Sequence, residues 1–520
     1  MWIRGPEYAP GIEASIDSPI LRIETQETGL NPFLIGPAMN QPFRFAFLAA
    51  LPFAALLSAQ QTPSPIAPYI KENAPVMVLE HVTIIDGTGA APQLDMRIVI
   101  SSHKIISVQP DNPSTPVPDG AKVLDLTGKT VIPGIVGMHE HLFYPLPNQP
   151  DAGNGLYAEM ADSAPRLYLA GGVTTARTAG SVEPYTDLEL KKQIDAGLIP
   201  GPKLDVTGPY LEGAGTFALQ MHQLADADDA GRAVDYWAAE GVTSFKAYNY
   251  ITADELKMAI HHAHFRGLKI TGHLCSIGFK EAADMGIDNL EHGIVVDTEF
   301  YSGKQPDICP DFRAAERELE SIVDISGPQV QDMIRDLVVH HVAVTSTLAI
   351  LETSIPNRPP LAIENLELKT LTPDAGRSYL ATRARVAERG GSPKILQVEM
   401  QFEREFVAAG GLLMAGCDPT GYGGVVPGFG DQRNIELLVD AGFPPVQAIE
   451  IATLNGAKYM GKDATIGSIA PGKTADLVVL GGNPAENIAN IEKVETVFKD
   501  GVGYDPAKLI QSVTGLVGLR

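Results

Sequence analysis

Cysteine, tryptophan and positive charge are all scarce in this chain. The 520 residues include 3 Cys and 2 Trp. Cys275, Cys309 and Cys417 are odd in number and widely spaced, a pattern that does not imply a disulfide framework, and we expect Cys275 and Cys417 to be small buried hydrophobic residues. Lys and Arg number 39 against 63 for Asp and Glu, a formal net charge of −24 with His neutral. Such a field repels polyphosphate and anionic lipid, so nucleic acid is not an expected partner.

Long apolar runs are also rare. The run at 45–57 follows Arg44 and precedes the short polar segment 58–60, which is typical of a signal peptide, with a buried first helix as the alternative. No later segment has the roughly 18 uninterrupted apolar residues of a membrane span, so we expect a periplasmic or secreted protein with no membrane contact after signal removal. We predict a non-native upstream extension at 1–38, a signal peptide at 39–59 that begins with the natural start Met39, and a linker at 60–75.

The remaining chain is apolar enough to build a large core. Hydrophobic residues make up 44% and charged residues 20%, as in a globular enzyme. Short apolar alternations broken by turns occupy 76–132 and return at 464–510, which predicts one small β-sandwich assembled from both chain ends. Between them, 133–463 alternates apolar strands with amphipathic helical stretches. Eight such units predict an α/β fold, a (β/α)8 TIM barrel.

Six polar residues stand at the ends of the predicted barrel strands. In a barrel of this kind the chemistry lies at the C-terminal ends of the strands, so polar residues there are candidate site residues. His139 and His141 are separated by one residue, and period-2 geometry points both imidazoles to the same side, as two ligands of one metal require. The others lie too far apart in sequence for one local loop, and only the barrel would bring them together. The six are His139, His141, Lys246, His273, His292 and Asp418.

The motifs around these residues resemble those of the amidohydrolase superfamily. They include VIPGIVGMHEHL, GVTTARTAG, SFKAY, ITGHL, the EHG of 291–293, GCDP and the closing IGSIAPGKTADLVVLGGNP. The resemblance covers about 76–502 and is strongest to the imidazolonepropionase-like and prolidase-like branch. It implies two divalent metal ions, with zinc the expected metal. Their implied ligands are His139, His141 and Asp418 for the more buried ion and His273 and His292 for the more exposed one, with a carboxylated Lys246 bridging the two.

The resemblance also implies a reaction. A hydroxide that bridges the two metals would cleave the amide bond of a small peptide or N-acyl amino acid, as in an Xaa-Pro dipeptidase or prolidase, with Asp418 transferring the proton. Tyr248 lies two residues past Lys246 and is either a hydrogen-bond donor to the oxyanion or a packed aromatic residue. Esters, lactones and phosphotriesters are the alternative substrates for the same site, and a scaffold protein without metals is the minor alternative.

Two further residues are weaker candidates for substrate contacts. His222 follows the predicted strand KLDVTGPYL at the catalytic face, where a plain loop residue is the alternative. Arg177 precedes Thr178, where many relatives have an aspartate, so Arg177 is either a free anion-binding group or differently paired. The resemblance also implies a homo-oligomer.

Overall fold

The computed structural model describes residues 64–146, 155–216, 218–322 and 324–518. The predicted extension at 1–38 and signal peptide at 39–59 lie outside these residues. Within the described part of the chain, none of the helices has the length and apolar character that crossing a bilayer requires.

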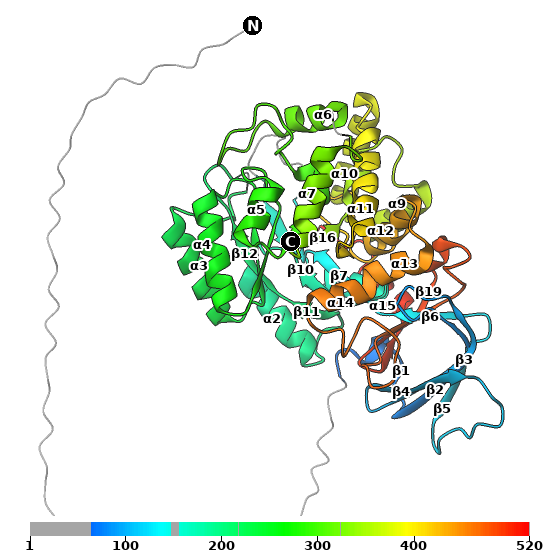
Figure 1. The fold of residues 1–520 in the computed structure, drawn as a ribbon. Helices are drawn as coiled ribbons and strands as arrows, with labels where there is room; N and C mark the ends of the chain where they lie inside the picture. Colours follow the sequence, from blue (N-terminus) through cyan, green and yellow to red (C-terminus); the bar gives the residue numbers. More distant parts are fainter. Residues whose placement is uncertain (1–63, 147–154, 217, 323, 519–520) are drawn as a thin grey trace, which may run out of the picture. The chain divides into compact units, whose positions relative to one another are not determined.

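Strands from both ends of the chain form one nine-stranded sheet. Its order is β1-β20-β19-β18-β6-β2-β3-β4, with β5 paired to β2. In Figure 1 the strands of the N-terminal segment, in blue, and those of the C-terminal segment, in red, belong to this sheet. Its strands are β1 (Ile70–Glu72), β2 (Val76–Ile84), β3 (Gln93–Ser101), β4 (Lys104–Pro110), β5 (Lys122–Asp125), β6 (Thr130–Pro133), β18 (Leu477–Leu480), β19 (Val494–Lys499) and β20 (Val502–Tyr504).

β1 lies inside the segment that the sequence predicts to be a linker. Ile70 pairs with Tyr504 in the antiparallel register of β1 and β20. The prolines of this segment lie on either side of the strand, Pro68 before it and Pro75 after it, and Ile70–Glu72 keeps the amide groups that a ladder needs. Part of the predicted linker is therefore an edge strand.

The middle of the chain forms parallel strands with intervening helices, as the alternating pattern predicts. β11-β10-β7 make a three-stranded parallel sheet and β12-β13-β14-β15-β16-β17 a six-stranded one. The strands are β7 (Ile135–Glu140), β10 (Val173–Thr178), β11 (Lys203–Asp205), β12 (Thr207–Leu211), β13 (Ser244–Ala247), β14 (Lys269–Gly272), β15 (Asn289–Glu291), β16 (Ala343–Ser346) and β17 (Leu413–Ala415).

The two parallel sheets approach each other at two places. A parallel bridge joins Ser181 to Pro209, beyond β10 and within β12. After β17, the Asp418 N–H donates to the carbonyl oxygen of His139 at 2.9 Å. The strand pairings thus define a mixed α/β fold with two parallel sheets, and the closed barrel stays a prediction.

The helices connect the parallel strands and lie around them in Figure 1. α4 begins as its sequence predicts, because Thr252 and Glu255 form a reciprocal capping box at its N-terminus. The helices are α1 (Ala164–Ala170), α2 (Pro184–Asp195), α3 (Ala227–Glu240), α4 (Ala253–Phe265), α5 (Phe279–Met285), α6 (Phe312–Ile322), α7 (Pro328–Val339), α8 (Leu348–Glu352), α9 (Leu361–Thr370), α10 (Pro373–Arg389), α11 (Pro393–Ala408), α12 (Phe429–Asp440), α13 (Pro445–Glu450), α14 (Gly456–Tyr459) and α15 (Pro506–Ser512).

Candidate active site

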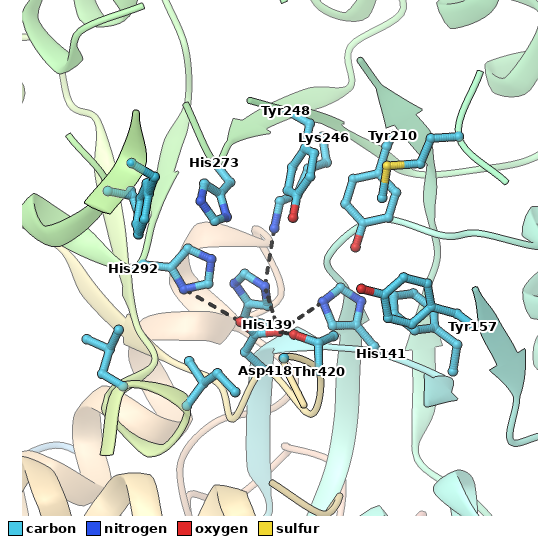
Figure 2. Close-up of a pocket in the computed structure, with 17 residues that line it drawn as sticks. His139, His141, Tyr157, Tyr210, Lys246, Tyr248, His273, His292, Asp418 and Thr420 are labelled. Atoms are coloured by element: carbon cyan, nitrogen blue, oxygen red, sulfur yellow. Dashed lines mark hydrogen bonds and ion pairs between the residues drawn. The ribbon is translucent and has the colours of Figure 1, made fainter. Parts of the chain in front are cut away.

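One cavity of about 430 Å³ collects the polar residues that end the parallel strands. All six predicted metal-site residues line it, and so does Tyr248. Figure 2 shows their side chains pointing toward one another from neighbouring strands. His139 and Lys246 lie in β7 and β13, and the others directly follow a strand: His141 after β7, His273 after β14, His292 after β15 and Asp418 a little beyond β17.

His139 in β7 and His141 directly after it are held by hydrogen bonds from their Nδ1 atoms. His139 Nδ1 lies 2.7 Å from Glu291 Oε2, and His141 Nδ1 lies 3.2 Å from the carbonyl oxygen of Gly180. Because each acceptor requires a proton on Nδ1, both Nε2 atoms keep a lone pair that is directed into the cavity. Glu140, between them, faces the other side of the strand, where it accepts a hydrogen bond from Cys417 Sγ at 3.0 Å.

Asp418 lies at the centre of the polar cluster. Its Oδ1 is 3.3 Å from His141 Nε2 and 3.7 Å from His139 Nε2. Its Oδ2 is 3.7 Å from His292 Nδ1. Burial opposes ionisation, but the surrounding histidines outweigh it and hold the pKa of Asp418 well below its usual range. The site therefore contains an ionised carboxylate among imidazoles.

Asp418 and His292 share an unusual backbone conformation. Their φ angles are 50° and 67°, in the left-handed region that residues other than glycine rarely adopt. His292 is also tied by its amide, which donates to Thr345, and by its Nδ1, which lies 2.7 Å from Thr347 Oγ1. Uncommon backbone conformations of this kind gather at functional sites, where the surrounding structure maintains them.

Burial favours the neutral form of the histidines in the site. Burial and Lys246 lower the pKa of His139 to about 4, against the opposite effect of Glu291 and Asp418. Burial and His139 lower that of His292 to about 3. Burial likewise depresses the pKa of His273, whose ring centroid lies 4.5 Å from that of His292. Neutral imidazoles offer the lone pairs that a metal ion requires.

Lys246 is fully enclosed by this cluster. It is 1% exposed, and its Nζ lies 3.2 Å from His139 Nε2. Burial lowers the pKa of Lys246 to about 8, although Glu291 and Asp418 act in the opposite direction. An amine with a lowered pKa is uncharged more often, which is the form that can react with carbon dioxide.

The donor set fits a divalent metal ion. Ligand atoms of His139, His292 and Asp418 all lie within 4.8 Å of one another, and all three residues are buried. Two imidazoles and a carboxylate are ligands that zinc accepts, and manganese or cobalt would also suit them.

Arg177 does not line the cavity, and of its two alternatives the structure shows the second, a different pairing. Its side chain is 1% exposed and its Nη2 lies 2.7 Å from Glu291 Oε1. Its Nε also donates to the carbonyl oxygen of Met138 at 2.7 Å. Arg177 therefore belongs to the layer behind the site, where Glu291 of another strand is its charge partner.

His222 is also outside the cavity. Its side chain is 64% exposed and its Nε2 lies 3.0 Å from Asp229 Oδ2, at the start of α3. The nearby pocket residue is Met221. The loop thus contributes the apolar side chain of Met221 to the cavity. His222 faces solvent instead and pairs with the Asp229 carboxylate of α3.

Glu291 is the most important residue whose role the sequence did not reveal. Besides His139 and Arg177, it accepts hydrogen bonds from Thr271 and Asn289 at 2.6 Å and 2.9 Å. Burial would raise the pKa of Glu291, but Arg177, His139 and Lys246 hold it well below its usual range. The only signal was its position next to His292, on the opposite face of the strand end.

The aromatic lining of the cavity was also missed. Phe143 of β8 (Phe143–Pro145), Tyr157 of β9 (Tyr157–Glu159) and Tyr210 of β12 line it beside Tyr248. The His141 ring stacks on Phe143 with centroids 4.6 Å apart. These residues come from separate strands, and nothing in their local sequence marks them as neighbours.

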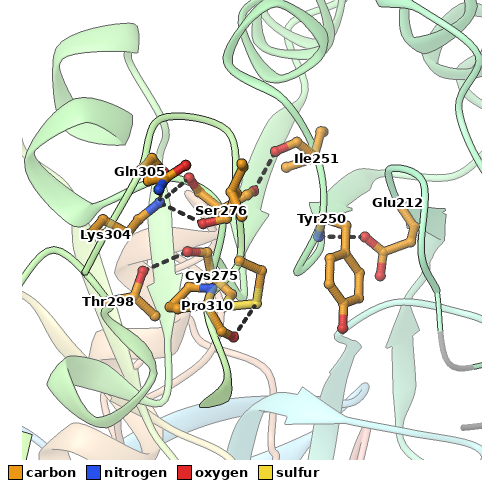
Figure 3. Close-up of a disulfide and its surroundings, with 11 residues drawn as sticks. Glu212, Tyr250, Ile251, Cys275, Ser276, Thr298, Lys304, Gln305 and Pro310 are labelled. Carbon is orange, nitrogen blue, oxygen red and sulfur yellow. Dashed lines mark hydrogen bonds between the residues drawn. A yellow bond between two sulfur atoms is a disulfide. The ribbon is translucent and has the colours of Figure 1, made fainter. Parts of the chain in front are cut away.

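Cys275 is disulfide-bonded, in contrast to the expectation that it is a free buried residue. It is joined to Cys309, with a Cα–Cα distance of 4.9 Å (Figure 3). The disulfide joins the segment after His273 to the segment before α6. The wide spacing of the two cysteines in the sequence gave no indication of this pairing. Cys417 is free and buried, as predicted.

Further contacts fix the loop around this disulfide. Thr298 Oγ1 donates to the carbonyl oxygen of Cys275 at 2.6 Å. Lys304 Nζ donates to the carbonyl oxygens of Ser276, Gln305 and Ile308. Figure 3 shows Thr298 and Lys304 directed at the 275–276 segment. These bonds hold two elements of the cavity together, the strand end at His273 and the start of α6 at Phe312.

Comparisons with known proteins show where the sequence and the fold are similar to those of other chains. The profile of the Amidohydrolase family matches residues 382–502. A candidate prolidase from Bifidobacterium longum is 26% identical, with a TM-score of 0.58 over 83% of this chain and 95% of that one. An Xaa-Pro dipeptidase with bound methionine is 20% identical, with a TM-score of 0.60 over 83% of this chain and 100% of that one.

Similarity to curated proteins is confined to a short stretch. Adenine deaminase 2 of Jannaschia sp. (strain CCS1) is 36% identical over 75 residues, 14% of this chain. The match spans 12% of that relative's own length. These findings agree on one class: residues 382–502 match the Amidohydrolase family profile, and the fold is similar to those of prolidase-like amidohydrolases. The chain also has a buried candidate metal site at His139, His292 and Asp418.

Proposed function

We propose that this protein is a binuclear metal-dependent amidohydrolase that cleaves the carbon–nitrogen bond of small amides. Short peptides, including Xaa-Pro dipeptides, and N-acyl amino acids are the substrate families to which the sequence resemblance points. The observation that carries the proposal is that all six ligand candidates line one cavity although they come from five separate positions in the chain. We further propose that the two parallel sheets close into a (β/α)8 barrel, which would explain this convergence.

The buried donor set of His139, His292 and Asp418 suits a divalent metal ion, and we propose two neighbouring ions here, with zinc as the metal. His139, His141 and Asp418 would hold one ion and His273 and His292 the other, with a carboxylated Lys246 between them. When bound, such ions supply Lewis acidity and lower the pKa of water. Carboxylation would convert the one cationic side chain of this cluster into an anion that can ligate both ions.

Asp418 is the proposed proton carrier. Its Oδ1 accepts a hydrogen bond from Thr420 Oγ1 at 2.7 Å and faces His141. Its Oδ2 has the longer contact, 3.7 Å to His292. We therefore assign the proton to Oδ2, from which it would pass to the leaving nitrogen.

Tyr248 is the proposed hydrogen-bond donor to the developing oxyanion. Figure 2 shows its hydroxyl directed into the cavity near Lys246. Burial raises the pKa of Tyr248 well above its usual range, so the hydroxyl keeps its proton and can donate it in a hydrogen bond.

A substrate panel tests the proposal. Dipeptides and N-acyl amino acids should be assayed beside lactones, aryl esters and phosphotriesters, with zinc and bicarbonate present. Amide turnover that is lost in His139→Ala and Asp418→Asn supports the proposal. Turnover of esters or lactones alone would support the alternative, in which the same site hydrolyses these substrates instead of amides. A chain that binds no metal and turns over no substrate would support a scaffold protein.

Export is a separate proposal. The Cys275–Cys309 disulfide favours an oxidising compartment such as the periplasm, where such bonds persist. N-terminal sequencing of the protein from its native host should give an end near Gln60. A retained Met1 would contradict export. Assembly as a homo-oligomer remains a prediction.

A further inference from the structure

The walls of the cavity are apolar on both sides of the polar cluster. An aromatic wall is made by Phe143, Tyr157, Tyr210 and Met221, which line the cavity and belong to one hydrophobic cluster. Figure 2 places the labelled members of this wall, Tyr157 and Tyr210, beside His141. Burial raises the pKa of Tyr157 to about 12, so this wall presents rings and neutral hydroxyls.

A second wall is mainly aliphatic. It consists of Val296, Ile350, Leu351 and Phe312, which also line the cavity. Val296 ends the short helix η2 (Gly293–Val296) that begins directly after His292, and Ile350 and Leu351 belong to α8. An amide placed at the polar cluster would thus have an apolar surface on each side.

Positive charge is confined to the centre of the cavity. Among the described residues that line it, Lys246 is the one Lys or Arg side chain, and Lys246 faces the metal-site histidines. The two candidate substrate contacts, Arg177 and His222, pair with Glu291 and Asp229.

These observations matter because a carboxylate that leaves water requires a partner. An unpaired charge against an apolar wall loses its hydration without compensation, whereas a carboxamide or alkyl group loses much less. The formal net charge of −24 adds a long-range repulsion of anions. Tyrosine hydroxyls can still donate to neutral carbonyl oxygens.

From the lining we infer that the enzyme selects uncharged amides with an apolar group on each side of the scissile bond, such as N-acyl amines and peptides with a blocked carboxyl end. The inference rests on the proposed amide hydrolysis. It departs from the free dipeptides and N-acyl amino acids named there, which carry a carboxylate near the bond that is cut, and favours their uncharged counterparts. The aromatic wall suits a phenyl-sized group, and the aliphatic wall suits an alkyl chain or a second ring.

Three matched compounds test this inference. The first is N-hexanoyl-phenylalanine, which carries a free carboxylate. The second is N-hexanoyl-phenylalaninamide, which has almost the same shape but an uncharged carboxamide. The third is N-hexanoyl-phenethylamine, which has neither a carboxylate nor a carboxamide at this position. Release of hexanoate by the zinc-loaded full chain is measured for each. We expect kcat/KM for both neutral compounds to exceed that for the acid by at least about tenfold, which corresponds to about 1.4 kcal/mol.

Two outcomes separate the inference from the proposed function. An acid that is hydrolysed as well as the carboxamide, or better, overturns the inference while leaving amide hydrolysis intact. Release of hexanoate from none of the three, together with turnover of esters or lactones, overturns the proposed function itself.

A charge introduced into the aliphatic wall provides a second test. Leu351→Arg, or Ile350→Lys if that variant does not fold by thermal melting, should improve the acid relative to the carboxamide by at least about fivefold, because the carboxylate then gains a cationic partner. Phe265→Arg is the matched control, since it adds the same charge on α4, where Phe265 is 83% exposed. A ratio that changes equally in the wall variant and the control contradicts the inference.

Discussion

Replacing Arg177 by methionine tests the layer behind the site. Arg177 Nη2 and Glu291 Oε1 are 2.7 Å apart and both residues are almost fully buried. Methionine fills a similar volume but leaves the Glu291 carboxylate without its cation. The other oxygen of that carboxylate accepts the hydrogen bond that orients His139.

The expected effect of Arg177→Met is large. At 2.7 Å the attraction between unit charges is about 6 kcal/mol with an effective dielectric constant of 20. Loss of one partner of a buried pair typically costs about 3 to 5 kcal/mol, because the remaining charge stays buried. We expect a loss of this size in the free energy of unfolding and a fall of about 10- to 100-fold in metal affinity, as for other residues that orient a metal ligand.

Metal titration and urea unfolding measure these two quantities, and substrate KM is measured at saturating metal. Arg266→Met is the matched control, because Arg266 forms an exposed ion pair with Asp235 at 2.9 Å whose loss should cost at most about 1 kcal/mol. A variant Arg177→Met with unchanged metal affinity and stability, but a raised KM for anionic substrates, would refute this reasoning and restore Arg177 as a substrate contact.

Three further predictions concern the disulfide, a buried carboxyl group and the proposed oxyanion donor. Cys309→Ser removes the disulfide that closes a loop with a sequence separation of 34, so the free energy of unfolding should fall by roughly 3 to 4 kcal/mol. KM should also rise, because Phe312 is then held less firmly in the cavity wall. Equal stability of the unmodified protein with and without dithiothreitol would contradict this. Burial raises the pKa of Glu367 to about 8 from its usual 4.5, so between these values the folded state keeps a proton that the unfolded state releases, and stability falls as pH rises. Glu367→Gln should flatten urea-unfolding stability between pH 5.5 and 7.5 by up to about 1.4 kcal/mol per pH unit, and an unchanged slope would contradict it. Tyr248→Phe should lower kcat by about 10²- to 10³-fold with little change in KM, and a loss below threefold would remove its proposed role.

The polar residues of the site were predictable because their position follows from strand geometry. Parallel strands present their C-terminal ends on one face, so His139, Lys246 and His273 could be grouped without knowing any contact. The alternation of His139, Glu140 and His141 also predicted which side chains share a face, and the structure places Glu140 on the other side.

The partners of those residues were not predictable in the same way. Arg177 lies near a strand end, where a substrate contact would also lie. Its side chain is nevertheless buried behind the cavity, because it forms an ion pair with Glu291 of a strand far away in the sequence. The sequence holds no local signal for this pairing, nor for the contact of Cys275 with Cys309. Such contacts depend on the three-dimensional packing of segments that are far apart in the chain.

The most direct test of the account is the metal content of the protein purified with zinc and bicarbonate. The proposed ligand set predicts close to two equivalents per chain, and fewer in His139→Ala and His273→Ala. A chain that binds no metal under these conditions, while folded by circular dichroism, would contradict the central claim.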